Sequence, residues 1–144
     1  MSAHVSRPGY LPATPVPDAG AGSELWVVWL DAPALAAIDA TEPNYERVRL
    51  PARYPVRLTP GQPVPECWVY RSRHGYLVNK AAEPRRLTDQ ATLISALLAE
   101  IPALQILAGV TPREWVQRTH DAKVRDAVRE VFRSARLVHR TGGL

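Results

Sequence analysis

The sequence contains a single cysteine, Cys67, among 144 residues. One cysteine excludes an internal disulfide bond and a zinc knuckle, which requires several cysteine ligands. The four histidines lie far apart in the sequence, and no two of them have the short spacing typical of metal ligands on one element: His4, His74, His120 and His139. We therefore expect no metal site and no cofactor.

Several other signals are also absent. There is no glycine-rich phosphate loop, no dinucleotide-binding motif and no Gly-x-Ser-x-Gly turn of serine hydrolases. No apolar run approaches the roughly 18 residues needed for a membrane span, and the N-terminus shows no apolar stretch typical of a secretory signal. These absences favour a cytoplasmic protein without membrane contact.

Proline is abundant but unevenly distributed, with eleven of the 14 prolines in residues 1–65. Because proline fixes φ and donates no hydrogen bond, this half favours short strands and turns. The second half is rich in Ala, Leu, Arg and Glu, which favour helices. We predict one α+β domain over residues 1–144, with an irregular lead-in over 1–22, a β-rich core with a short helix over 23–80, and helices over 88–140.

The strongest strand signal is the apolar and aromatic run Ser23–Leu30. Asp31 and Pro33 then indicate the N-cap and first turn of a short helix over about 32–40, which Pro43 ends. Alternating or β-branched residues predict further short strands at four places: residues 46–51, 54–59, 66–73 and 76–78.

The helical half carries clear end signals. Thr88 is the predicted N-cap of a helix that runs to about Glu100. Thr111 and Glu114 form a capping-box pattern with proline between them, and Asp121 is the predicted N-cap of a last helix to about Leu137.

The net charge of +4 lies entirely in residues 111–144, which hold eight basic and four acidic residues. A basic face of this kind is one signature of phosphate binding, and it comprises Arg113, Arg118, Lys123, Arg125, Arg129, Arg133, Arg136 and Arg140. The alternative is a solvated helix face with partial pairing of Asp121 with Arg125 and of Glu130 with Arg133. No aromatic residues are interleaved with the basic ones, so nucleic-acid binding is the less favoured interpretation.

Residues 25–50 carry the strongest chemical signal. They contain a predicted strand, a short helix, the acid Glu42 at the end of that helix, Tyr45 and a second strand. Glu42 lies near the negative end of the helix dipole, which disfavours a charged carboxylate and suits general acid–base catalysis. Tyr54 and Tyr70 are further candidates for the walls of a pocket. The alternative is an exposed glutamate at a helix end.

Leu35–Val48 contains an acid, Asp39, then Glu42 and Tyr45 at a predicted strand, and Cys67–Tyr70 supplies a later strand of the form Cys-Trp-Val-Tyr. These two stretches resemble the gamma-glutamylcyclotransferase-like superfamily. The order and spacing agree over about residues 9–78, roughly half of the chain.

The resemblance implies a compact cyclotransferase-like β-barrel with flanking helices and a small γ-glutamyl compound as substrate. Glu42 matches the family's glutamate, which shuttles a proton while the α-amine of a γ-glutamyl group attacks its own γ-carbonyl. The products are 5-oxoproline and a released amine. Tyr45 and Tyr70 match residues that line the pocket, and the reaction requires no cofactor.

The chain departs from the family pattern at two places. Pro43 stands where the family has glycine, and no segment of the chain matches the family's substrate-binding Tyr-Gly-Ser-Asn-Leu loop. The alternative function is therefore a catalytically silent interaction or small-molecule-binding module on the same fold. In that case the C-terminal helices are the expected surface for a protein partner.

Overall fold

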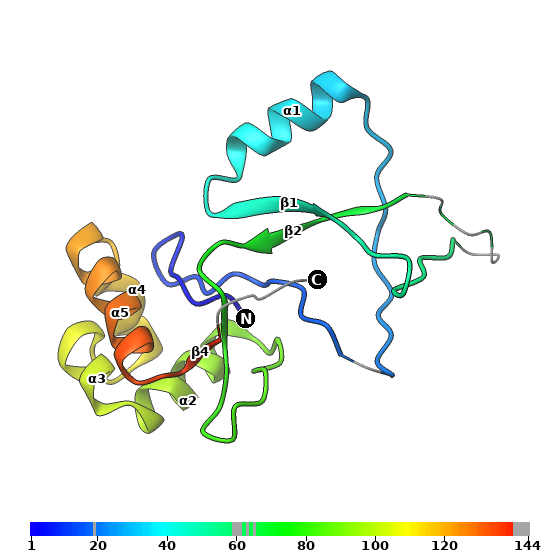
Figure 1. Cartoon of the computed structure of the whole chain (residues 1–144). Coiled ribbons are helices and arrows are strands. Elements are labelled where there is room, and N and C mark those ends of the chain that lie inside the picture. The colour runs from blue at the N-terminus through cyan, green and yellow to red at the C-terminus, as the bar shows by residue number, and fades with distance from the viewer. Residues whose placement is uncertain (19, 59–61, 63, 65, 140–144) are drawn as a thin grey trace. The chain divides into compact units, whose positions relative to one another are not determined.

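The computed structural model describes residues 1–18, 20–58, 62, 64 and 66–139 (Figure 1). Contacts divide these residues into two compact units. The hairpin unit comprises residues 15–73, and the helical unit comprises residues 1–14 together with the described residues from 74 onward. Five helices and four short strands are present among the described residues, so the predicted α+β class is confirmed.

The hairpin unit contains α1 (Ala32–Thr41), β1 (Tyr45–Arg49) and β2 (Trp68–Ser72). The carboxylate of Asp31 accepts a hydrogen bond of 2.9 Å from the backbone N–H of Ala34, so the predicted N-cap of α1 is confirmed. No residue of α1 is fully buried. A short helix with no buried side chain has little packing energy of its own and depends on its caps and on polar contacts.

Strands β1 and β2 pair antiparallel, with Tyr45 opposite Ser72 and Arg47 opposite Tyr70. Paired residues of an antiparallel ladder lie on the same face, and successive residues alternate between faces. The register therefore places Tyr45, Arg47 and Tyr70 on one face of the sheet. The opposite face carries Glu46 and Arg71, whose side chains form a 2.6 Å ion pair.

The predicted strand at Ser23–Leu30 is wrong. These residues form neither strand nor helix, and the hairpin unit's described strands, β1 and β2, pair only with each other. The strand predicted over residues 54–59 is also not found, because residues 54–58 form no strand. Thr59 lies outside the described residues. Composition favours an extended chain, but a strand also needs a ladder partner, which local sequence does not specify. The described strands form two separate two-stranded sheets, so the predicted closed barrel is not found.

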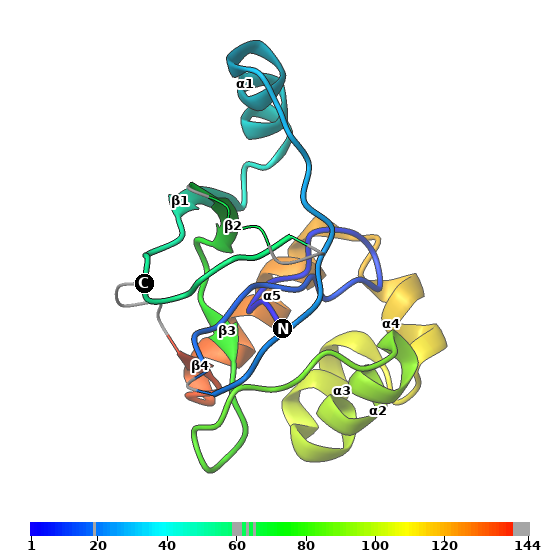
Figure 2. The same cartoon turned by 90° about the vertical axis from the view of Figure 1, so that its right-hand side faces the viewer.

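The helical unit contains four helices and a second small sheet (Figure 2). Helices α2 (Gln90–Glu100), α3 (Pro102–Ala108), α4 (Pro112–Arg118) and α5 (Ala122–Ser134) follow one another, and β3 (Tyr76–Leu77) pairs antiparallel with β4 (Val138–His139). Within the described part of the chain, no single helix is long and apolar enough to cross a membrane. Helices α2 and α3 meet the length and composition criteria only as a pair, and a bend of 117° separates them.

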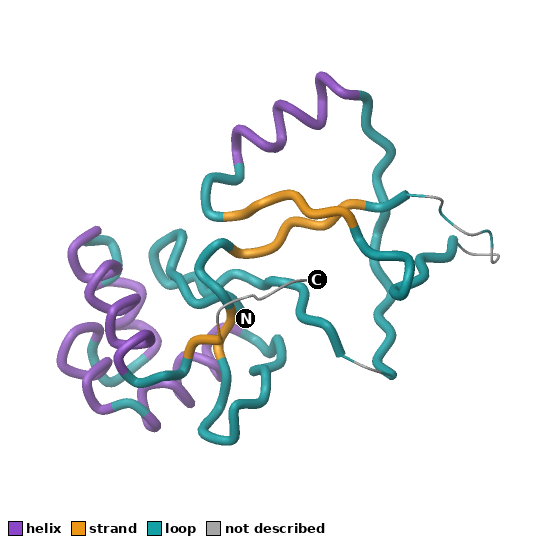
Figure 3. The backbone as a smooth tube through the Cα atoms, viewed as in Figure 1, coloured by secondary structure: helices purple, strands orange, loops and turns teal. Residues whose placement is uncertain are grey.

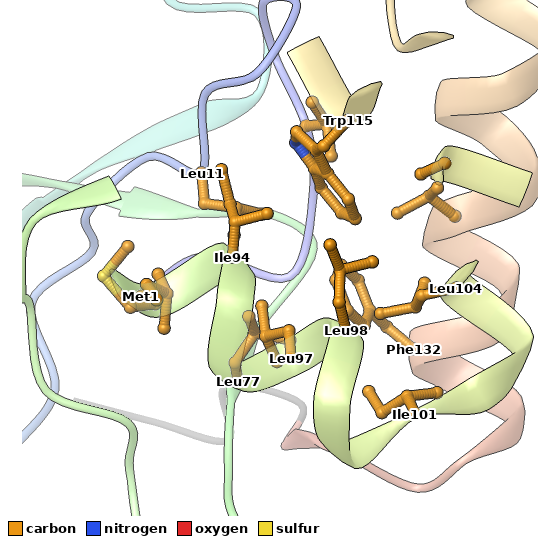
Figure 4. Close-up of a cluster of buried hydrophobic side chains, with 14 of the residues drawn as sticks. Met1, Leu11, Leu77, Ile94, Leu97, Leu98, Ile101, Leu104, Trp115 and Phe132 are labelled. Atoms are coloured by element: carbon orange, nitrogen blue, oxygen red, sulfur yellow. The ribbon is translucent and has the colours of Figure 1, made fainter. Parts of the chain in front are cut away.

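Trp115 and Phe132 are fully buried at the centre of the helical unit (Figure 4). Aliphatic side chains of α2, α3 and the residue between them belong to the same core cluster, and these include Ile94, Leu97, Leu98, Ile101 and Leu104. Each of these helices thus turns an apolar face to one common core.

The first residues of the chain belong to this core, although the sequence predicted an irregular lead-in. Met1, Val5 and Leu11 are buried, while residues 1–14 form only isolated β-bridges. The side chain of Gln90 fixes Leu11 in place, because it accepts from the Leu11 N–H and donates to the Leu11 carbonyl, both at 3.0 Å. An irregular segment can pack tightly when side chains satisfy its backbone polar groups.

Glycine is required at the turn before β3. Gly75 has φ +84°, and a Cβ atom there would lie 2.2 Å from the carbonyl oxygen of His139 on the paired strand. A larger residue would therefore meet both backbone strain and a clash. The chain turns at Arg73 and His74, between β2 and β3.

The end signals of the later helices are largely confirmed. Thr111 and Glu114 form the predicted capping box of α4, and Asp121 caps α5. The exception is α2, where Asp89 rather than Thr88 is the N-cap and accepts a 2.9 Å hydrogen bond from Thr92 N–H.

This difference at α2 predicts unequal effects of two neighbouring substitutions. Asp89→Ala is expected to lower the free energy of unfolding by about 1 kcal/mol, because an N–H of the first turn loses its acceptor. Thr88→Ala is the matched control and is expected to have almost no effect, because among the described residues the Thr88 hydroxyl bonds only the adjacent carbonyl of Asp89. Urea unfolding of both variants measures the difference, and a larger loss at Thr88 would contradict the assignment.

Candidate functional site

The C-terminal end of α1 carries a cluster formed by an acid, a tyrosine and an arginine. The Tyr70 hydroxyl donates a 2.7 Å hydrogen bond to Oδ1 of Asp39, and the same oxygen accepts a 3.2 Å hydrogen bond from Nε of Arg47. Asp39 lies on the last turn of α1, whereas Arg47 and Tyr70 are opposite each other on β1 and β2. These contacts hold the end of the helix against one face of the two-stranded sheet.

The cluster changes the acidity of both partners. The hydrogen bond from Tyr70, together with Arg47, holds the pKa of Asp39 below its ordinary value. Partial burial raises the pKa of Tyr70 to about 12, and the hydrogen bond to Asp39 and the nearby charges of Asp39 and Glu42 contribute to that increase. At neutral pH the site therefore contains an ionised Asp39 and a neutral tyrosine hydroxyl.

Glu42 follows α1 directly and is its C-cap residue. Its backbone N–H donates to the carbonyl of Asp39 at 3.3 Å, and its own carbonyl accepts from the N–H of Tyr45 at 3.0 Å. This turn fixes the backbone of Glu42 and Tyr45 between helix and strand. Among the described residues, no hydrogen bond or ion pair engages the Glu42 carboxylate.

The structure therefore places the three predicted site residues in one region of the hairpin unit. Glu42 is half-buried and lies close enough to Tyr70 to influence its ionisation, and Tyr45 shares a sheet face with Tyr70. Tyr54, the further wall candidate, has its ring under the guanidinium of Arg53 at 5.1 Å.

Sequence reasoning missed the roles of Asp39, Arg47 and Trp68. The guanidinium of Arg47 lies 4.9 Å from the centre of the Trp68 ring, which is within cation–π range. Asp39 was visible as a second acid three residues before Glu42, on the same side of a helix. Nothing in the local pattern pointed to its hydrogen bond with Tyr70, which is 31 residues away.

The basic face of α5 is used largely inside the helical unit. Arg125 donates to the carbonyls of Thr119 and His120, and Arg129 donates to the carbonyl of Val5 and pairs with Asp126. Of the two predicted charge pairs, Glu130–Arg133 is present, whereas Arg125 bonds backbone oxygens instead of Asp121. Arg140 lies outside the described residues.

Other candidate groups among the described residues lie outside this cluster. Cys67 is half-buried, and no cluster of three metal-ligating side chains occurs within the described ranges. In the helical unit, Ser2 Oγ lies 2.5 Å from Nδ1 of His4, but both residues are fully buried. Burial lowers the pKa of His4 to about 3, so this imidazole is neutral at physiological pH.

Tyr70 provides a direct test of the cluster. Subtracting the alkaline absorbance titration of Tyr70→Phe from that of the wild type isolates the ionisation of Tyr70. This difference should have its midpoint near pH 12 rather than at the ordinary value of about 10. Tyr70 loses its hydroxyl proton at a lower pH in the unfolded chain than in the folded one. Its contribution to the free energy of unfolding is therefore fully present below about pH 10 and is lost as the pH rises towards 12. Asp39→Asn should move the midpoint towards 10, and an unchanged midpoint in that variant would contradict the role of Asp39.

No protein-family model matches the chain, and no curated protein and no solved structure matches it. The fold and the site therefore define the class at a coarse level. The chain is an α+β protein whose hairpin unit carries two acids, Asp39 and Glu42, beside a tyrosine and an arginine at one helix end.

Proposed function

We propose that the chain is a gamma-glutamylcyclotransferase-like enzyme that releases 5-oxoproline from a γ-glutamyl amine, with Glu42 as the general acid–base. The observation that carries this proposal is the Glu42 carboxylate, which no described residue engages, beside the Asp39–Tyr70–Arg47 cluster. Asp39 is committed to two hydrogen bonds, so Glu42 is the acid left to move a proton.

The charges around this helix end suit the amino-acid end of a γ-glutamyl group, which carries an ammonium and a carboxylate. The two acids attract the ammonium, and the terminal nitrogens of Arg47 make no hydrogen bond to any described residue and are available to the carboxylate. The rings of Tyr45 and Tyr70 then provide the side walls. Recognition of this kind uses charge-assisted hydrogen bonds, which are stronger than neutral ones.

The proposed reaction balances without a further reactant. Glu42 takes a proton from the α-ammonium, and the nitrogen lone pair freed in this way forms a bond to the γ-carbonyl carbon. The bond between that carbon and the amide nitrogen then breaks, and Glu42 gives its proton to the departing nitrogen. The second proton of the departing ammonium comes from the ring nitrogen, which loses it as the lactam forms. The products are 5-oxoproline and the free amine, so neither water nor a cofactor is consumed.

The experiment for this proposal is a turnover assay on a series of γ-glutamyl compounds that differ in the amine released. We expect 5-oxoproline and the free amine in equal amounts from at least one of them. Absence of 5-oxoproline release from every compound in the series would overturn the enzymatic proposal.

A second candidate function is a non-catalytic interaction module. It is favoured by a shallow apolar groove in the helical unit, lined by Ile101, Ala103 and Leu107 near α3 and by Ala127, Val131 and Ala135 near the end of α5. If this candidate is correct, calorimetry detects saturable binding of a γ-glutamyl compound or of a protein partner, whereas 5-oxoproline never forms.

A further inference from the structure

The hairpin unit exposes an apolar segment to solvent between residues 25 and 30. Leu25 is 80% exposed, Trp26 99%, Val28 70% and Trp29 69%. The segment forms neither helix nor strand and is drawn as a loop leading into α1 (Figure 3). Monomeric soluble proteins rarely leave a contiguous apolar patch of this kind uncovered, and such patches mark interaction sites.

The sequence of this segment has two properties that bear on its partner. It reads Leu-Trp-Val-Val-Trp-Leu, which is the same in both directions. In a strand, therefore, each of the two faces would carry one leucine, one valine and one tryptophan. Glu24 and Asp31 bound the run on either side. A run of β-branched and aromatic residues of this kind has the composition of a strand.

We propose that residues 25–30 form an intermolecular strand that pairs antiparallel with the same segment of a second copy of this chain. A dimer of two-fold symmetry uses the same patch on both copies, so the patch must complement itself. Pairing about an axis at Val28 places Trp26 of each copy opposite Leu30 of the other and the two Val28 side chains opposite each other. This register sets no acid opposite another acid.

The exposed area is consistent with this occupant. A tryptophan exposes up to about 250 Å², so Trp26 and Trp29 offer on the order of 400 Å² per copy at their present exposure. Cross-strand pairing covers the flanks of these side chains, so the interface belongs to the small class that buries less than about 1,200 Å² in total and forms in a concentration-dependent way.

The test is the mass of the full chain in solution over a concentration series, measured by sedimentation or light scattering. The wild type is expected to shift from 15.9 kDa to twice that mass as the concentration rises. Val28→Lys places two cations at the two-fold axis and should raise the dimer dissociation constant at least 100-fold. Ile106→Lys is the matched control, because Ile106 of the helical unit is 80% exposed against 70% for Val28. This variant should leave dimerisation unchanged.

A cross-linking measurement tests the register. In a Cys67→Ser background, Val28→Cys should give a disulfide-linked dimer on mild oxidation, whereas Ile106→Cys should not. A wild type whose mass stays at 15.9 kDa up to high micromolar concentrations would overturn the proposal. A dimer that persists in Val28→Lys would overturn it as well. Binding of the monomer to lipid vesicles through Trp26 would overturn it too, since the segment would then have another occupant. The result is independent of the 5-oxoproline assay.

Discussion

Replacing Glu42 with glutamine is expected to reduce the rate of 5-oxoproline release by about 10²–10⁴-fold, because the amide is isosteric but cannot accept the proton of the attacking amine. Stability should hardly change, since no described residue bonds the Glu42 carboxylate. Surface changes of this kind usually alter the free energy of unfolding by less than about 0.5 kcal/mol. Product formation and thermal midpoint are the two measurements.

Glu24→Gln is the matched control for this substitution. Glu24 lies in the same unit and is exposed, but it is outside the Asp39–Tyr70–Arg47 cluster. It should retain the wild-type rate. Equal rates for Glu42→Gln and the wild type would remove Glu42 from the reaction, and a large drop in the thermal midpoint would assign it a structural role instead.

Trp115→Ala is expected to cost about 3–5 kcal/mol of stability, the largest loss for any single substitution considered in this chain. Trp115 is fully buried, and its ring packs in the core of the helical unit with Phe132 and the leucines of α2 (Figure 4). Deleting the ring removes its burial energy and leaves a cavity that the surrounding helices fill only in part. Urea unfolding followed by circular dichroism measures the loss.

Trp26→Ala is the control for size and chemistry, because it removes the same side chain from a position that is 99% exposed. In dilute solution we expect a change within about 0.5 kcal/mol. A comparable loss at both positions would contradict the assignment of Trp115 to the core and of Trp26 to the surface.

Features set by local chemistry were predicted well from the sequence. The caps Asp31, Asp121 and the Thr111–Glu114 box each depend on residues within one helical turn, and all are confirmed. The N-cap of α2 was misplaced by one residue, because Thr88 and Asp89 are both good caps and the sequence alone does not choose between them.

Features that depend on distant partners were not predictable in the same way. Leu25–Leu30 has the composition of a strand, yet a strand also requires a pairing partner, which composition does not provide. The hydrogen bond between Asp39 and Tyr70 depends on the register of β1 and β2. Residues 1–14 enter the core without regular structure, and hydrophobic periodicity does not detect such a segment.

The candidate site likewise combines residues that the sequence predicts with contacts that it does not. Glu42, Tyr45 and Tyr70 were named as candidates from the resemblance, and the structure places them in one region of the hairpin unit. Their catalytic and binding roles stay predictions. The contacts of Asp39 with Arg47 and Tyr70 emerge only with the fold, and they determine which of the two acids is available to a substrate.

The most direct test of the proposed function compares two isomers, γ-glutamyl-alanine and α-glutamyl-alanine, with the same purified chain. Both carry an ammonium and carboxylates, but only the γ-isomer presents the amide carbonyl that its own α-amine can attack to form a five-membered ring. We predict that mass spectrometry detects 5-oxoproline and alanine in equal amounts from the γ-isomer and neither product from the α-isomer. Release from both isomers, or from neither across the γ-glutamyl series, would contradict the assignment.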